Sequence, residues 1–282
     1  MEILSNRPCV IGEGPIWNEK NGLIYHVNGY GPNEICIINP KTKELTVRKL
    51  PFGVAAIAFS EKGEMIVSCE NGAFILNDDN TTKPLYDPNI IIKNGNDAKV
   101  GPDGRLYIGT QSSKRKGDGD QIDGKLYSID KDGKVKILLD GLILSNGFDW
   151  SMDEKRLYHT DSDTGIIREY NFDKESGEVT PTGRNVEVAG VDGITIDQND
   201  LLYVACWGYS HIAVVDTANM QIKEYIDIPT RIPASCCFAG EDMNKFVVVT
   251  STLGIDLEKD EKAGFTFRSN IGAKGRKPYL FG

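Results

Sequence analysis

The feature that most constrains the fold is a strand–turn–strand unit that recurs along the chain. Its clearest copy is LSNGFDWSMDEKRLYHTD at residues 144–161, where an apolar strand ending in Trp150 meets a polar turn and a second strand. Two strands joined by such a turn cannot bury a face alone, so the unit needs neighbours. Five further copies have first strands that end at Trp17, Phe59, Val100, Ile196 and Phe238.

A third strand-like run follows each of the first five units, and a fourth, looser run follows some of them. Four short strands per unit, at a period of about 40 to 50 residues, predict an all-β, six-bladed β-propeller. We expect four-stranded antiparallel blades around a central channel, with residues 1–282 forming one propeller domain. Two separate β-sandwiches fit less well, because no linker rich in Pro, Ser or Gly divides the chain.

Two segments lie outside the regular units. Residues 2–4 (Glu-Ile-Leu) precede the first unit, and we expect them to add an outer strand to the sixth blade and so fasten the ring. Closure of this kind removes the exposed strand edges that an open row of blades would leave. The polar stretch 112–124 is predicted to be a loop inside the third blade.

The composition narrows the class of protein and its partners. Among the 282 residues, 40% are hydrophobic and 26% charged, which is typical of a globular protein with a sizeable core. The net charge of −9 gives no reason to expect binding to nucleic acid or to an anionic membrane. The six cysteines form no C-x-x-C pair, so we expect buried free thiols and a cytoplasmic protein. The expected partner is a small-molecule substrate, and the expected assembly is a monomer or a weak homo-oligomer.

The repeat register points to a candidate site. The position four residues before the last large apolar residue of each first strand is occupied by Glu13, Ala55, Asn96, Asn146, Asp192 and Ala234. The first strand of each propeller blade lines the channel, so these six positions should ring one mouth of it. Four of them carry side-chain oxygens. Such a donor set suits one divalent cation, Ca²⁺ or Mg²⁺ first, with Mn²⁺ or Zn²⁺ as alternatives.

Other interpretations of these residues carry less support. Asn146 or Asp192, each followed by glycine, could singly be a turn residue, but the shared register favours a site. His26 and His159 occupy equivalent second-strand positions, and without an H-E-x-x-H motif we expect them to be buried hydrogen-bonding groups rather than zinc ligands. Ser145 lies outside any G-x-S-x-G motif, which argues against a serine hydrolase.

Several separated motifs resemble those of the gluconolactonase, regucalcin (senescence marker protein) and luciferin-regenerating enzyme family. The matching segments, in chain order, are GEGPIW at 12–17, NDAKV at 96–100, PDGR at 102–105, SNG at 145–147, DG at 192–193 and CCF at 236–238. The resemblance implies a six-bladed propeller with one divalent metal at the channel mouth. It implies that Glu13, Asn146 and Asp192 hold the metal, and that Asn96, beside Asp97, contacts substrate.

Two departures from the family's pattern fall near the expected substrate position. Sugar-lactonase members often have an Arg two residues before the Asn-Asp pair, where this chain has Asn94. An acidic residue that some members carry after the Gly-Thr at 109–110 is replaced here by residues 111–114 (Gln-Ser-Ser-Lys). Lactone hydrolysis therefore remains the expected class of reaction, while gluconolactone itself is in doubt as the substrate.

The leading hypothesis is a metal-dependent lactonase acting on a sugar (aldono)lactone. Its cation would polarise the lactone carbonyl and activate a bound water. Asp192 would accept the proton from that water, and Asn96, with Asp97 and Asn94, would bind substrate. The alternatives are a phosphotriesterase-type hydrolase using the same cation and a non-catalytic, calcium-binding propeller scaffold.

Overall fold

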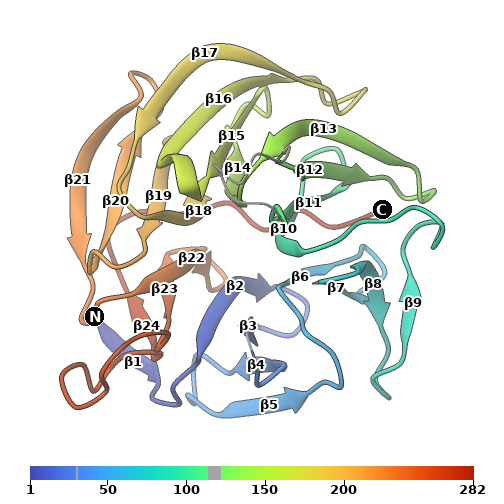
Figure 1. The fold of residues 1–282 in the computed structure, drawn as a ribbon. Coiled ribbons are helices and arrows are strands. Elements are labelled where there is room, and N and C mark those ends of the chain that lie inside the picture. The colour runs from blue at the N-terminus through green and yellow to red at the C-terminus, as the bar shows by residue number, and fades with distance from the viewer. Residues whose placement is uncertain (30, 114–121) are drawn as a thin grey trace.

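Six four-stranded antiparallel sheets form a ring in the computed structural model, which describes residues 1–29, 31–113 and 122–282. Figure 1 shows the blades around the central channel, which is lined by the first strand of each sheet. The six-bladed β-propeller predicted from the repeats is therefore confirmed. Most of the predicted loop at 112–124, including Lys114, lies outside the described residues.

Five blades use consecutive strands. The first contains β2 (Ile11–Asn18), β3 (Leu23–Gly29), β4 (Glu34–Ile38) and β5 (Leu45–Lys49). The second contains β6 (Ala56–Phe59), β7 (Met65–Cys69), β8 (Gly72–Leu76) and β9 (Thr82–Pro84). The third contains β10 (Gly95–Val100), β11 (Leu106–Thr110), β12 (Gly124–Ile129) and β13 (Val135–Leu142). The fourth contains β14 (Ser145–Trp150), β15 (Arg156–Asp161), β16 (Ile166–Phe172) and β17 (Val179–Glu187). The fifth contains β18 (Val191–Ile196), β19 (Leu201–Cys206), β20 (His211–Asp216) and β21 (Gln221–Asp227).

The sixth blade joins the two ends of the chain. It contains β22 (Pro233–Ala239), β23 (Lys245–Thr250), β24 (Thr266–Ser269) and β1 (Glu2–Ser5). β1 pairs antiparallel with β24 through Ile3 and Phe267, so the predicted fastening of the ring by residues 2–4 is confirmed. The one helix among the described residues is the 3₁₀ segment η1 (Ser162–Thr164), and no helix in that part of the chain is long and apolar enough to cross a membrane.

The hydrophobic core is divided into clusters that lie between neighbouring blades. Between blades 3 and 4, fully buried Trp150 packs edge-on against Tyr107 with ring centroids 4.8 Å apart. Phe172 contacts the same indole at 5.9 Å. Edge-to-face packing of this kind adds a geometric preference to apolar burial, and it fixes the angle between the blades.

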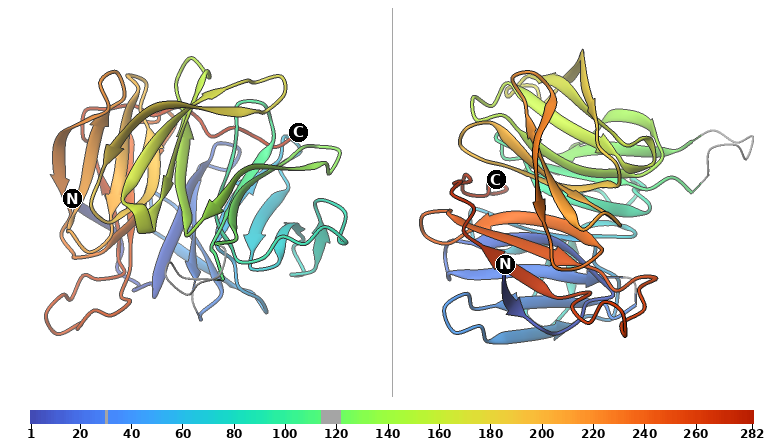
Figure 2. Two further views of the ribbon diagram at one scale, coloured as in Figure 1. Left: turned by 45° about the horizontal axis from the view of Figure 1, so that its top comes forward. Right: turned by 90° about the vertical axis from the view of Figure 1, so that its left-hand side faces the viewer.

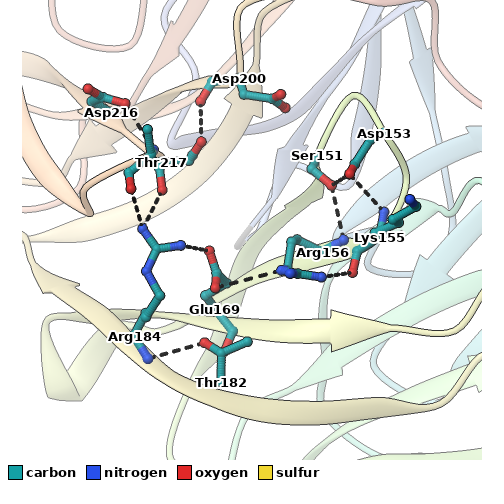
Figure 3. Close-up of polar contacts among 11 residues, drawn as sticks. Ser151, Asp153, Lys155, Arg156, Glu169, Thr182, Arg184, Asp200, Asp216 and Thr217 are labelled. Carbon is teal, nitrogen blue, oxygen red and sulfur yellow. Dashed lines mark hydrogen bonds and ion pairs between the residues drawn. The ribbon is translucent and has the colours of Figure 1, made fainter.

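A polar network, which we call the blade 4–5 clasp, joins those two blades at their outer strands (Figure 3). Glu169 on β16 is buried, and its carboxylate accepts a 2.6 Å hydrogen bond from Arg184 on β17. The same guanidinium donates to Thr217 O and Ala218 O of blade 5, at 2.8 and 2.7 Å. Arg156 approaches the other carboxylate oxygen at 3.8 Å. Charged hydrogen bonds to backbone carbonyls thus tie one blade to the next.

Residues 270–282, the C-terminal strap, cross one face of the ring after β24 (Figures 1 and 2). Gly275 N donates to Met243 O of blade 6, and Gln198 N of blade 5 donates to Lys274 O. Further along, Phe281 forms a parallel bridge with Ser60 of blade 2. The strap therefore links blades on opposite sides of the channel.

Candidate functional site

Five of the six residues aligned by the repeat register lie at β-bulges near the start of the channel-lining strands, and the sixth, Ala55, directly precedes β6. The register shifts between Glu13 and Ile16 in β2, and comparable shifts occur in β10, β14, β18 and β22. In β10, β14 and β18 the bulged pairs are Asn96-Asp97, Asn146-Gly147 and Asp192-Gly193. A bulge bends the strand locally and re-aims its side chains. We call this end of the strands the channel mouth.

Two of the aligned glycines allow the blades to approach closely at the mouth. A Cβ on Gly147 would overlap the backbone oxygen of Asp192, and a Cβ on Gly193 would overlap Ser235 Oγ. Both glycines are buried. The Asx-Gly sequence in blades 4 and 5 therefore serves close backbone contact, and it leaves the preceding Asn or Asp beside the neighbouring blade.

Asn146 and Asp192 are brought together directly. They are 7% and 5% exposed, and Asn146 Nδ2 donates a hydrogen bond to Asp192 Oδ1. This bond sets the orientation of the amide, because its nitrogen points to the carboxylate. Asn146 Oδ1 and Asp192 Oδ2 remain as the oxygens that a ligand can use.

The carboxylates at the mouth disfavour one another's charge. Burial raises the pKa of Glu13 well above its ordinary value, and the negative charges of Asp192 and Asp97 raise it further. Burial and then Asp97 likewise raise the pKa of Asp192, although the Asn146 hydrogen bond opposes the shift. For Asp97, burial raises the pKa to about 6, against a lowering by Lys99. Three carboxyl groups, of which Asp192 is buried and Glu13 and Asp97 are partly buried, have insufficient counter-charge and form a site that a cation would stabilise.

The donor set fits a hard divalent cation. Carboxylate and amide oxygens from blades 1, 4 and 5 are the ligands that Ca²⁺ and Mg²⁺ prefer. Glu13 lies on β2, Asn146 on β14 and Asp192 on β18, so the ring brings together residues up to 179 positions apart, from 13 to 192. The ligand roles predicted for these three residues rest on this fit and stay predictions.

The predicted substrate residues occupy the neighbouring blade. Asn96 Nδ2 donates to Ser145 O at 3.1 Å, which holds its side chain toward blade 4. Asp97 Oδ1 accepts from the backbone of Ala98 at 2.8 Å. Asn94 precedes β10 with a left-handed φ of 55°, and its Nδ2 donates to Gln111 O at 3.2 Å. Asn94 is thus tied to its own blade, while Asn96 spans two.

The two second-strand histidines are buried hydrogen-bonding groups, as expected. His159 Nε2 lies 2.8 Å from the hydroxyl of Ser145, the residue before Asn146. Burial lowers the pKa of His159 to about 3, so the imidazole is neutral at physiological pH. His26 is equally buried, and its pKa is lowered to about 4 for the same reason. All six cysteines are buried free thiols, which confirms that prediction as well.

Sequence reasoning missed a second charged cluster at the other end of the channel, which we call the channel floor. Asp149 accepts a hydrogen bond from Lys99 Nζ at 2.8 Å and another from Arg276 of the strap. Burial would raise the pKa of Asp149, but Arg276 and then Lys99 hold it below its ordinary value. Lys99 and Asp149 lie three positions after Asn96 and Asn146, so the repeat register could have revealed them. No sequence signal placed Arg276 there.

A cavity of about 80 Å³ is lined by Lys99, Asp149 and Arg276 of the channel floor together with Asp97 and Ser235, and Glu13, Asn146 and Asp192 are not among its lining residues. Its walls alternate polar groups with apolar ones such as Ile194 and Phe238. A small pocket with a few convergent polar groups is the usual form of a ligand site.

Comparison with known proteins agrees with this architecture. Residues 11–252 match the family model described as the SMP-30/gluconolactonase/LRE-like region. The putative sugar lactone lactonase YvrE of Bacillus subtilis is 33% identical over 284 residues, covering 97% of this chain and 95% of that protein. Regucalcin of Oryctolagus cuniculus is 29% identical, covering 97% and 95%.

Among solved structures, the calcium-binding protein regucalcin of Agrobacterium tumefaciens superposes with a TM-score of 0.88. The alignment covers 99% of this chain and 96% of that one, at 23% sequence identity, and it shows a shared fold. The family match extends over most of the chain and includes every first strand of the ring. The chain therefore belongs to the SMP-30/gluconolactonase/LRE-like family.

Proposed function

We propose that the protein is a divalent-metal-dependent lactonase that opens the ring of a sugar lactone. The observation that carries the proposal is the group of mutually repelling carboxyls at the channel mouth, Glu13, Asp97 and Asp192, with the Asn146 amide among them. Membership of the gluconolactonase-like family and similarity to a putative sugar lactone lactonase support the choice of reaction. The name of the Agrobacterium structure, a calcium-binding protein, supports Ca²⁺ as the first cation to test.

Glu13, Asn146 and Asp192 would hold the cation through their side-chain oxygens. When bound, the cation supplies a Lewis acid that polarises the lactone carbonyl and lowers the pKa of water. The chain contributes position and proton transfer. Asn96 donates its Nδ2 hydrogen to Ser145 O, and its amide oxygen would accept a hydrogen bond from a substrate hydroxyl.

Asp192 is the proposed proton acceptor. Oδ1 accepts a hydrogen bond from Asn146 and has a second lone pair that would bind the cation, so Oδ2 would take the proton from the attacking water. As water adds to the carbonyl carbon, the ring C–O bond breaks and the proton passes to the departing ring oxygen, which gives a hydroxy acid.

The test is a panel of aldonolactones and organophosphate esters, assayed with chelator and after readdition of Ca²⁺, Mg²⁺, Mn²⁺ or Zn²⁺. We expect chelator-sensitive lactone hydrolysis. Asp192→Asn should lower kcat/KM by at least about 100-fold, since it removes both a ligand charge and the proton acceptor. Gln198→Ala, a blade 5 change beside the strap, is the control and should retain activity.

Three outcomes would overturn the proposal. Turnover of organophosphates alone indicates a phosphotriesterase, and no metal-dependent turnover of any substrate indicates a calcium-binding scaffold. Unchanged lactonase activity and metal content in Asp192→Asn removes Asp192 from the site.

A further inference from the structure

A second group of potential metal ligands lies at the seam of the ring, on β3, on β4 and in the segment that leads into β2. Cys9 is in the segment that leads from β1 in blade 6 to β2 in blade 1. Its backbone is held by blade 6, since Cys9 N donates to Gly264 O at 2.9 Å and Cys9 O accepts from Thr252 N at 3.1 Å. His26 on β3 and Cys36 on β4 face each other as partners in the register of blade 1.

The three side chains converge. The two sulfurs and one ring nitrogen of His26 all lie within 4.8 Å of one another. The exposures of Cys9, His26 and Cys36 are 2%, 1% and 1%. Ligand atoms around a tetrahedral Zn²⁺ are about 3.5 Å apart, because Zn–S and Zn–N bonds are about 2.3 and 2.0 Å long. A modest inward rotation of the side chains would therefore complete three of the four coordination positions.

The hydrogen bonds of His26 leave a lone pair for a cation. Nδ1 lies 3.1 Å from Val27 O, which can only accept, so Nδ1 carries the proton and Nε2 does not. The Thr266 hydroxyl is 3.3 Å from Nε2, a long contact for an O–H donor. A histidine that binds a metal usually donates its other ring N–H to a carbonyl or carboxylate, and His26 already does so.

Arg7 supplies positive charge and lies on the solvent side of the cluster. Its Nη1 is 4.0 Å from Cys36 Sγ, and its Nη2 pairs with buried Glu34 at 2.7 Å. The Arg7 side chain is 37% exposed, so solvent reaches this side of the Cys36 thiol. A guanidinium next to a sulfur favours the thiolate form, which is the form that binds metal.

We propose that Cys9, His26 and Cys36 form a second metal site, which takes a thiophilic cation of the Zn²⁺ type. Two thiolates and a neutral imidazole are soft and borderline donors, unlike the all-oxygen set at the channel mouth. On binding, each thiol loses its proton to solvent and the imidazole keeps its Nδ1 proton. The resulting complex has no net charge, which suits a buried position.

The site spans the junction that closes the ring. Cys9 is held against blade 6, while His26 and Cys36 belong to blade 1, so a bound cation would cross-link the junction between the first and last blades. Binding to this arrangement stabilises the closed ring relative to the unfolded chain. The proposal is independent of the lactonase activity.

The experiment titrates Zn²⁺ into metal-free full-length protein against a chromophoric chelator. It uses a background variant, Glu13→Gln with Asp192→Asn, that removes the two carboxylates proposed as metal ligands at the channel mouth. We expect one tightly bound Zn²⁺ per chain in this background. Adding Cys36→Ser should weaken binding by at least about 100-fold. Cys69→Ser, which removes a buried thiol of blade 2, is the matched control and should leave binding unchanged.

A second measurement uses the wild-type protein and does not depend on variants that fold. X-ray absorption at the zinc edge, with Ca²⁺ in large excess to fill the channel mouth, should show sulfur neighbours at about 2.3 Å when one equivalent of Zn²⁺ is bound. Zinc surrounded by oxygen and nitrogen alone would overturn the proposal. Equal affinity in the Cys36→Ser and Cys69→Ser proteins would do the same.

Discussion

Asp192 at the channel mouth and Asp149 at the channel floor are buried carboxylates on first strands of adjacent blades, 5% and 3% exposed. Their surroundings differ in charge. Asp149 is bonded to Lys99 and Arg276, which hold its pKa down. Asp192 is bonded to a neutral amide and faces Asp97 and Glu13, and its pKa is raised. Burial is common to the two groups, so the difference arises from the neighbouring charges.

The contrast in charge supports the channel mouth as the proposed cation site. At the floor, the chain provides its own cations from β10 and from the C-terminal strap. At the mouth it gathers carboxyl groups and leaves their charge uncompensated. The floor is therefore a structural ion-pair network, while the mouth stores electrostatic repulsion that binding of a cation would relieve.

The largest expected effect is at the floor. Asp149→Asn should lower the free energy of unfolding by about 3 kcal/mol, because removal of one partner leaves two cations without their anion. Urea denaturation of metal-free protein with unchanged m-value measures this loss. Lys277→Gln, which removes a charge of the strap that pairs with Glu19 at the surface, is the control and should change stability little. A loss no larger in Asp149→Asn than in this control would contradict the role of the floor.

The stability contributed by the carboxyl groups of the channel mouth should depend on pH in the opposite sense to that contributed by Asp149. The native pKa of Asp97 is raised from 3.8 to about 6, and those of Glu13 and Asp192 are raised as well. The native state therefore binds protons more tightly than the unfolded state, and the stability this provides is lost as pH rises through the native pKa values. In chelator, the Tm should fall between pH 5 and pH 7.

Two controls sharpen this pH prediction. Saturating Ca²⁺ should remove most of the fall in Tm, because the cation stabilises the ionised carboxylates. Glu13→Gln should reduce the fall in chelator, because it removes one of the repelling charges. Asp149 acts in the opposite direction. Its pKa is lowered in the folded protein, so the stability that it contributes is lost as pH falls. If the Tm of the metal-free protein rises from pH 5 to pH 7, the carboxyl groups of the channel mouth do not lack counter-charge as proposed.

The smallest effect concerns the blade 4–5 clasp, where Glu169 is buried but paired outside the channel. Glu169→Gln should lower the free energy of unfolding by about 1 kcal/mol, because Arg184 keeps its bonds to Thr217 O and Ala218 O. The guanidinium side chains of Arg184 and Arg156 are 41% and 40% exposed, so solvent screens them more than Lys99 and Arg276. Chemical denaturation will show whether this loss is smaller than that of Asp149→Asn.

Much of the fold could be predicted because its signals are local. Strand alternation, polar turns and the recurrence of a large apolar residue at positions such as Trp17 and Trp150 define six units without knowledge of the contacts between them. The same counting brought Asn146 and Asp192 into one register, and the structure places them in direct contact. The strand from residues 2–4 could be predicted because a ring of six leaves one blade short of a strand.

The remaining features depend on contacts that no local pattern encodes. Arg276 reaches Asp149 across 127 residues through a strap without regular secondary structure. The Cys9–His26–Cys36 cluster forms because blade 1 packs against blade 6, and its ligand spacing resembles no compact metal motif. The bulge that sets Asn96 and Asp97 between Gly95 and Ala98 is a property of strand pairing, so the sequence placed them at the mouth but could not predict their orientation.

The pairing of β1 with β24 also has a consequence for folding during synthesis. Glu2 and its partner Arg268 are 266 residues apart. At about 10 residues per second, the ribosome needs roughly half a minute to deliver that partner after β1 is made. During this interval β1 has no neighbour and the nascent blades form an open arc with two free edges, which invites association with other nascent chains. Polysome crowding and slow elongation should therefore affect the yield of this protein more than that of a fold whose first strand pairs at once.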